Sequence, residues 1–259
     1  MSKKETALAT TGVNLPAHLQ DQKAIGLDKV GENTLTPRLC ITHSTSSAEL
    51  KSRLPEKSIS LSATDICVAE ALATSSGIDG VRASESFIGV PVYHWVTFEK
   101  RSDFQDTSTD FIVDSTQDRD SELARRCEDF DLQEEEYTVG QKKFTYKYLK
   151  CLNYIIEIQT GEAAGEICAY TYCSGDYRTG RQFNSLLKRR GVSIFNNRVE
   201  FFTMHRTNKQ GNNWLTIGFS DPQDEDGNYI QSSEESKRLM QIYQDFAAGE
   251  ARVVSAEQQ

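Results

Sequence analysis

The sequence predicts a mainly β protein with α-helical additions, and three stretches support this prediction. Residues 87–98 are rich in β-branched and aromatic side chains and are flanked by the charged residues Glu85 and Lys100, which is typical of a strand. Residues 143–156 alternate with a period of two, so one face carries mostly aromatic and aliphatic side chains. The apolar runs 198–206 and 213–219 flank a polar segment and predict a β-hairpin.

The N-terminal half predicts less regular structure. Residues 1–34 are polar without a sustained period, so we expect a flexible N-terminal arm. Pro37 biases residues 35–41 toward extended structure. Residues 44–85 predict nothing firmer than a short helix or strand near 64–73. Residues 101–136 predict a long acidic insertion, since they show little periodicity and are too long for a hairpin loop.

The C-terminal half predicts alternating strands and helices. A strand at 165–173 is followed by Ser174, Gly175 and Asp176, which suit the start of a helix that ends at Gly191. A second helix covers about 232–248 and is followed by the tail 249–259.

The resulting order predicts one OB-like domain over residues 35–248. The predicted elements follow one another as strand, long excursion, strand, strand, helix, strand and strand. A five-stranded OB barrel with its helix between strands 3 and 4 has this order. Here the barrel would carry an N-terminal arm and a C-terminal helix. Such barrels bind single strands of nucleic acid across one sheet face.

Charge divides the chain sharply. Residues 101–136 hold thirteen Asp/Glu against four Lys/Arg, whereas residues 137–220 hold twelve Lys/Arg against five Asp/Glu. The whole-chain charge of −9 hides this contrast. Basic side chains interleaved with aromatic ones suit a single-stranded nucleic acid, because cations bind phosphates and flat rings stack on unpaired bases. We also expect the acidic segment to compete with DNA for the basic surface; the alternatives are a structural extension or a self-association element.

The candidate DNA-binding residues come from the basic segment. The basic candidates are Lys142, Lys143, Lys147, Arg178, Arg181, Lys188, Arg189, Arg198 and Arg206. The candidates for base stacking are Tyr146, Tyr148, Tyr172, Tyr177 and Trp214. Each of these candidates also has a purely structural interpretation. An aromatic strand face often belongs to the core, and lysines on an edge strand protect it from pairing with other strands. Cations at a helix C-terminus complement the helix dipole.

Several segments together resemble a known family. The residues are 35–39, the strand 89–98, Tyr170-Thr171-Tyr172-Cys173-Ser174, Thr179-Gly180-Arg181-Gln182-Phe183-Asn184, Arg189-Arg190-Gly191-Val192-Ser193-Ile194-Phe195 and Tyr243-Gln244-Asp245-Phe246. They resemble a loosely defined set of tailed-phage single-stranded DNA-binding proteins. That resemblance implies a barrel core and a role in phage DNA replication, recombination and repair, in the host cytoplasm. Residues 44–85 depart from the pattern, and the tail 249–259 is not strongly acidic.

Other functions find less support in the sequence. No phosphate-binding glycine loop and no hydrolase or metalloprotease motif is present, so we expect neither an enzyme nor a cofactor. The six cysteines contain no C-x-x-C pair, which favours buried thiols over a metal site. Neither a signal peptide nor a membrane-spanning run is found, so we expect a cytoplasmic protein. Its expected partners are single-stranded DNA and replication or recombination proteins, with a homo-oligomer left open. The alternative is a virion or assembly protein that uses the barrel for protein contacts.

Overall fold

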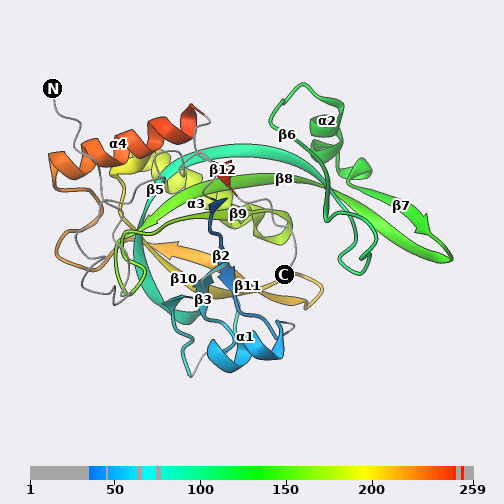
Figure 1. Ribbon diagram of the computed structural model, residues 1–259, viewed down its shortest axis with the longest axis horizontal. Coiled ribbons are helices and arrows are strands. Elements are labelled where there is room, and N and C mark those ends of the chain that lie inside the picture. Colours follow the sequence, from blue (N-terminus) through cyan, green and yellow to red (C-terminus); the bar gives the residue numbers. More distant parts are fainter. Residues whose placement is uncertain (1–34, 45, 63–65, 74–76, 249–251, 254–259) are drawn as a thin grey trace, which may run out of the picture.

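A seven-stranded antiparallel sheet forms the centre of the computed structural model, which describes residues 35–44, 46–62, 66–73, 77–248 and 252–253. The sheet runs in the order β11–β10–β5–β8–β7, with β6 added to β5 and β9 added to β8 (Figure 1). Its strands are β5 (Arg82–Arg101), β6 (Ile112–Thr116), β7 (Glu134–Val139), β8 (Lys142–Ile158), β9 (Ile167–Tyr172), β10 (Val199–Thr207) and β11 (Asn213–Ser220).

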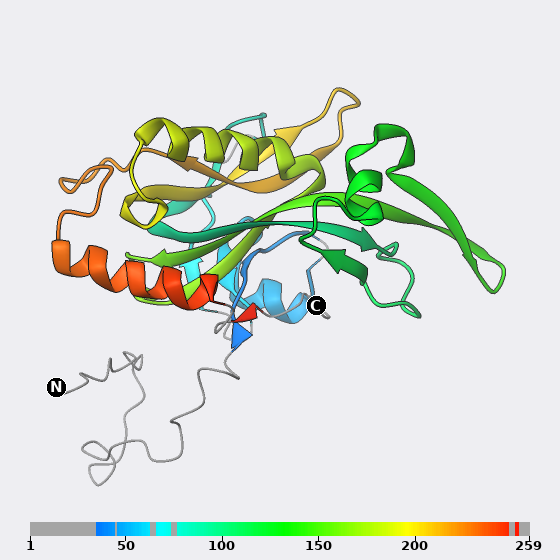
Figure 2. The ribbon, with the colours of Figure 1, turned by 90° about the horizontal axis from the view of Figure 1, so that it is seen from above.

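Strands β5 and β8 form the long ribbon on which the rest is built. They span 20 and 17 residues and pair from Gly89↔Ile158 to Arg101↔Lys147, with a register shift between Pro91 and Tyr93. Their length follows from the β-branched and aromatic residues that both contain. The far end of the ribbon continues as the β7–β8 hairpin, which projects beyond the other elements (Figure 2).

Helices pack on both faces of this sheet, as Figure 2 shows. On one face, α3 (Tyr177–Arg190) contributes Phe183, Leu186 and Leu187 to the main core. On the other, α4 (Ser233–Ala247) packs Leu239 against Val92 and Ile155. Both faces of β8 are therefore covered, and all its residues from 151 to 158 are buried.

The helix ends follow the predicted chemistry. Gly191 takes the left-handed conformation at the end of α3, with φ 69°, which glycine adopts at little steric cost. The Ser232 side chain accepts a hydrogen bond from the backbone N–H of Glu235 at the start of α4. Both helices are thereby confirmed within a few residues of their predicted bounds.

A smaller layer is built from the N-terminal part. Strands β2 (Leu39–Ile41), β3 (Ile59–Leu61) and β4 (Cys67–Ala69) form a three-stranded sheet, and α1 (Ala48–Arg53) connects the first two. Strand β1 (Leu35–Thr36) pairs in parallel with β12 (Arg252–Val253). Residues 44–85 thus hold more regular structure than expected. Ile59 and Leu61 pack into the main core against residues that are distant in the sequence.

The acidic segment is an ordered extension of the sheet. It contains β6, α2 (Glu122–Glu128), a short 3₁₀ helix (η2, Phe130–Leu132) and β7. Ala124 and Cys127 of α2 pack against Phe98 and Tyr148, forming a separate small core. The expectation of an irregular insertion is corrected, since burial of a few side chains organises a segment whose own sequence has little periodicity.

The mainly β class with helical additions is confirmed, whereas a closed barrel is not found. Within the described residues, no backbone pairing joins β9 to β11. The five-stranded OB barrel stays a prediction, and so does the single-domain division. The predicted arm at 1–34 and most of the predicted tail lie outside the described residues. No helix in the described ranges is long and apolar enough to cross a membrane.

Candidate nucleic-acid interface

A groove with a volume of about 980 Å³ lies between α3 and the β10–β11 hairpin. Four arginines line it: Arg178, Arg181, Arg189 and Arg206. Tyr177, Met204, Leu186 and Phe219 add apolar surface to the same walls. The groove therefore combines cations with an apolar lining.

The stripe of cations on α3 follows from helical periodicity. Thr179, Gly180, Phe183, Leu186 and Leu187 are buried against the sheet, so the residues between them face outward. Arg178, Arg181 and Arg189 fall at spacings of three and eight, which place them along one side of an α-helix. All three side chains are exposed.

These three arginines lack acidic partners among the residues that the structure describes. None of the salt bridges in that part of the chain involves Arg178, Arg181 or Arg189. Arg206, on the opposite wall, donates to the Oγ1 of Thr179 at 3.2 Å and lies 4.0 Å from Asp79. Like charges gathered in a groove repel one another, so a bound polyanion would relieve that repulsion.

Trp214 lies beside the groove and is held there by a specific contact. Its indole Nε1 donates to Oδ1 of Asp176 at 2.7 Å. Gly175, which lines the groove, leaves room for the ring: a Cβ at that position would lie 3.2 Å from the indole. Burial raises the pKa of Asp176, against the opposing effect of the Trp214 hydrogen bond.

The structure gathers six of the predicted binding residues at or beside this groove. Tyr177, Arg178, Arg181, Arg189 and Arg206 line it, and Trp214 packs on Gly175. Lys188 is exposed on the same helix. The sequence signal for the residues on α3 was the basic, polar side of an amphipathic helix, whereas Arg206 and Trp214 come from the predicted β-hairpin.

A second set of predicted residues lies on the projecting β7–β8 hairpin. Lys142 and Lys147 are exposed there, and Lys143 forms an ion pair with Glu136 at 3.5 Å. The ring of Tyr146 stacks on Tyr137 with centroids 3.7 Å apart. Because α3 lies well back along the ribbon from the hairpin, these residues belong to a different surface from the groove (Figure 2).

Three predicted binding residues are buried, which corrects their assignment: Tyr172, Tyr148 and Arg198. Tyr172 has no exposed surface, and its hydroxyl donates to the Ile217 carbonyl at 3.0 Å. Tyr148 packs under α2 and its hydroxyl donates to Glu135. Alternation along a strand cannot tell a covered face from an open one, so both rings were misread as a possible stacking surface.

Arg198 is buried for a different reason. Its guanidinium donates to both carboxylate oxygens of Asp224, at 2.9 and 2.6 Å, and to the Gly227 carbonyl at 3.0 Å. The hydrogen bond to Asp224 raises the pKa of Arg198. This arginine ties a loop to the sheet and presents no free charge to a phosphate.

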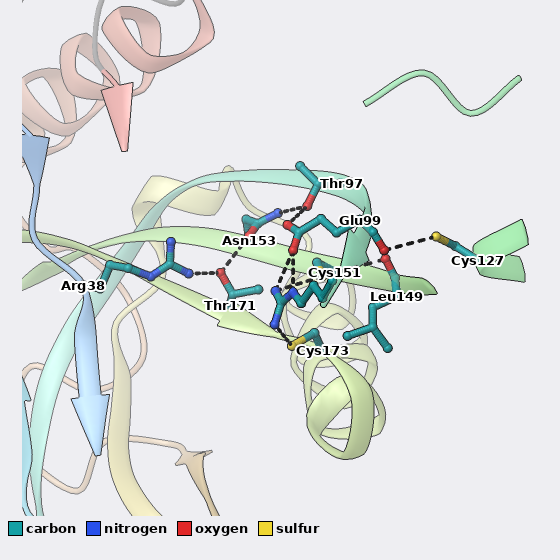
Figure 3. Close-up of polar contacts among 10 residues, drawn as sticks. Arg38, Thr97, Glu99, Cys127, Leu149, Cys151, Asn153, Thr171 and Cys173 are labelled. Carbon is teal, nitrogen blue, oxygen red and sulfur yellow. Dashed lines mark hydrogen bonds and ion pairs between the residues drawn. The ribbon is translucent and has the colours of Figure 1, made fainter. Parts of the chain in front are cut away.

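A polar network that the sequence patterns did not predict lies on the face of the sheet opposite α3 (Figure 3). Hydrogen bonds run from Arg38 to Thr171 at 2.6 Å, from Thr171 to Asn153 at 2.7 Å and from Asn153 to Thr97 at 3.0 Å. Thr97 donates to Glu99 at 2.7 Å, and Glu99 pairs with Arg101 at 2.6 Å. The alternation of Thr97, Glu99 and Arg101 was the available signal, but the predicted strand ended at Phe98.

The described residues show no cluster suited to a metal ion. No group of three or more His, Cys, Asp or Glu side chains in them is placed to hold one.

Comparison of the chain with protein-family models, with curated proteins and with solved structures gives no match. The resemblance to phage single-stranded DNA-binding proteins therefore stays a prediction.

Proposed function

We propose that this protein binds single-stranded DNA without sequence preference, through the groove between α3 and the β10–β11 hairpin. The observation that carries the proposal is the stripe formed by Arg178, Arg181 and Arg189, exposed in one groove with no acidic partner among the described residues. Phosphates supply the missing negative charge, and they do so at every nucleotide whatever the base.

Aromatic side chains favour an unpaired strand over a duplex. Tyr177 lines the groove and Trp214 packs against its edge. Bases of a duplex are stacked on one another, whereas those of a single strand are free to stack on such rings. Phosphate contacts to the arginines and base contacts to these rings together suit a single strand.

The strand pairings support the finer proposal of an OB-like core. With β5 as the first strand, β8, β9, β10 and β11 follow in order, and α3 lies between the third and fourth. The pairings of β5 with β8 and β10, of β8 with β9 and of β10 with β11 are all antiparallel, as the Greek-key OB topology requires.

Tyrosine side chains span the position where a barrel would close. Tyr172 of β9 donates to the Ile217 carbonyl of β11, and the Ile217 N–H donates to the hydroxyl of Tyr170 at 3.3 Å. The two strands are thus linked through side chains. The groove lies beside the helix, whereas OB barrels usually bind across strands 2 and 3, so the proposed site differs from the usual OB binding face.

The proposed biological setting comes from the sequence resemblance. Tailed-phage proteins of the kind described above protect and present single strands during replication, recombination and repair, and we propose the same role here. A cytoplasmic location in the host follows from that role.

A charge reversal in the groove tests the proposal. Arg181→Glu changes the net charge by the same amount as Arg119→Glu, and Arg119 is exposed on the acidic extension. We expect Arg181→Glu to weaken binding of a labelled oligothymidine by roughly tenfold at low salt and to lower the slope of affinity against salt concentration. The Arg119 variant should bind as the wild type does. Equal effects of the two variants would refute the groove, and absence of binding by the wild type at low salt would refute the function.

A second candidate function, protein assembly, is favoured by exposed apolar side chains on the acidic extension. Phe104 is 80% exposed and Phe130 is 86% exposed. Contiguous exposed apolar patches mark contact surfaces for other proteins, and these two rings are the candidates for such a surface on the extension. If assembly is the function, Phe104→Ser with Phe130→Ser should abolish self-association measured by light scattering and leave oligonucleotide binding intact.

A further inference from the structure

Two cysteines face each other across neighbouring strands in the polar network. Leu152 of β8 pairs with Tyr172 of β9 in antiparallel register, so the next residues, Cys151 and Cys173, lie opposite each other. Directly opposed residues in an antiparallel pair have Cα atoms about 4.5–5.5 Å apart, within the roughly 4.4–6.8 Å that a disulfide spans. Both thiols are free.

One guanidinium contacts both sulfurs. Arg101 donates through Nη1 to Sγ of Cys173 at 3.4 Å and through Nη2 to Sγ of Cys151 at 3.5 Å. The guanidinium of Arg101 also forms an ion pair with Glu99 at 2.6 Å. This ion pair holds the guanidinium in place beside the two sulfurs. A cation held against two opposed thiols favours the deprotonated form of one of them.

The two thiols differ in acidity. A hydrogen bond from Cys151 and the nearby charge of Arg101 lower the pKa of Cys173 to about 7, although burial, Glu99 and Asp176 oppose the shift. The pKa of Cys151 is raised, first by that same hydrogen bond and then by its burial. Among the other described cysteines, burial raises the pKa of Cys67, Cys127 and Cys168. Cys173 is half-buried and Cys151 is fully buried, so Cys173 is the more accessible of the two residues.

We propose that Cys173 and Cys151 form a reversible redox pair that reacts with a peroxide. The thiolate of Cys173 attacks one oxygen of hydrogen peroxide, the O–O bond breaks and hydroxide leaves, which gives a sulfenic acid on Cys173. The sulfur of Cys151 then attacks that of Cys173, the S–S bond forms, the S–O bond breaks and water leaves with the Cys151 proton. The two sulfurs give up two electrons, and the peroxide becomes one water and one hydroxide.

Arg101 assists both steps. In the first it stabilises the thiolate of Cys173. Once Cys173 is oxidised and uncharged, the same guanidinium is left to stabilise negative charge on Cys151 as that sulfur attacks. The register of β8 with β9 places the resolving thiol of Cys151 next to the sulfenic acid, which limits further oxidation by a second peroxide.

This proposal does not rest on DNA binding, and its test needs no nucleic acid. The folded full-length chain is treated with hydrogen peroxide, and peptides are mapped by mass spectrometry without reduction. We expect a Cys151–Cys173 disulfide, with a mass loss of two hydrogen atoms that a dithiol reverses. Cys67→Ser, which removes a cysteine outside the pair, should leave the reaction unchanged.

Variants separate the two thiols. Cys151→Ser should stop the reaction at a sulfenic acid on Cys173, which a dimedone probe labels, and Cys173→Ser should form no disulfide. Arg101→Met should slow the reaction at neutral pH by roughly tenfold, with Arg101→Lys between it and the wild type. If Arg101→Met fails to fold, labelling of Cys151→Ser still decides the matter. A disulfide between other cysteines, sulfenic acid on Cys151, or no loss of thiols in the folded wild type would overturn the proposal.

Discussion

The indole Nε1 of Trp214 donates a hydrogen bond of 2.7 Å to Oδ1 of Asp176. The contact joins β11 to the 3₁₀ turn Ser174–Asp176 (η3), which leads into α3. It therefore fixes the β10–β11 hairpin relative to the helix that carries the arginine stripe, and it gives Trp214 a structural role beside any role in stacking.

Changing Trp214 to Phe tests this role. The variant keeps an aromatic ring but leaves Asp176 without its donor, so we expect it to lower the free energy of unfolding by about 1 kcal/mol. Urea unfolding measures the loss, and Trp214→Ala should lose more stability because the packing of the ring is also removed.

An oligonucleotide titration tests the stacking role of Trp214: Trp214→Ala should weaken binding by roughly 1–3 kcal/mol if the ring stacks on bases. A folded Trp214→Ala variant with wild-type affinity would make the residue purely structural.

Tyr172 provides the converse case. Its hydroxyl links β9 to the Ile217 carbonyl of β11, and its ring is fully buried. Tyr172→Phe should therefore lower the free energy of unfolding by about 1 kcal/mol and leave oligonucleotide affinity unchanged. Chemical denaturation and a binding titration on the same sample measure both. Weakened binding without any loss of stability would contradict the assignment of Tyr172 to the core.

The Arg198–Asp224 pair should make stability depend on acidic pH. The hydrogen bond from Arg198 lowers the pKa of Asp224 below its ordinary value. A carboxyl whose pKa is lower in the folded chain stabilises the fold above its unfolded pKa of about 3.9. That contribution is lost as the pH falls through the lower, folded value.

Asp224→Asn should remove this part of the pH dependence. We expect a lower melting temperature at pH 7 and a smaller difference from the wild type toward pH 2–3, measured by circular dichroism. Asp114→Asn, at an exposed position on β6, serves as the control. A constant difference between variant and wild type over that whole pH range would rule out this linkage.

Acidic side chains of the extension neutralise lysines on β8. Point substitutions of these acids therefore test whether the extension regulates DNA binding without deleting it. Glu136 pairs with Lys143, and Glu128 pairs with Lys150. Replacing both acids by Gln removes two negative charges without deleting β7 or α2. If the extension competes with DNA for these lysines, single-strand affinity should rise at low salt by about twofold for each pair, the scale of an exposed ion pair.

The rise should disappear at high salt, because screening weakens such contacts. Glu162→Gln, at an exposed acid in the β8–β9 turn, removes one negative charge and is the control for each single replacement, Glu136→Gln or Glu128→Gln. The same increase in that control would indicate a general charge effect, and no increase in any folded variant would leave the extension with a structural role.

Local sequence patterns were enough to predict the individual strands and helices. Period-two alternation predicted β8 and the terminal hairpin, and glycine and serine chemistry predicted where α3 and α4 end and begin. Amphipathic spacing on α3 also identified Arg178, Arg181 and Arg189 as one outward stripe. Each of these signals acts within a few residues, so the chain carries it without knowledge of its neighbours.

Which faces of the strands are covered depends on long-range packing, and local patterns do not predict it. Helix α4 buries one side of β8 and α3 the other, so Tyr172 lies in the core although its strand pattern resembles an open face. The pairing of β8 with β9 brings Cys151 opposite Cys173, and the loop after β11 supplies the acid that neutralises Arg198. These contacts join residues 22 to 26 positions apart, and no local pattern encodes them, because burial and pairing depend on which distant segment packs alongside.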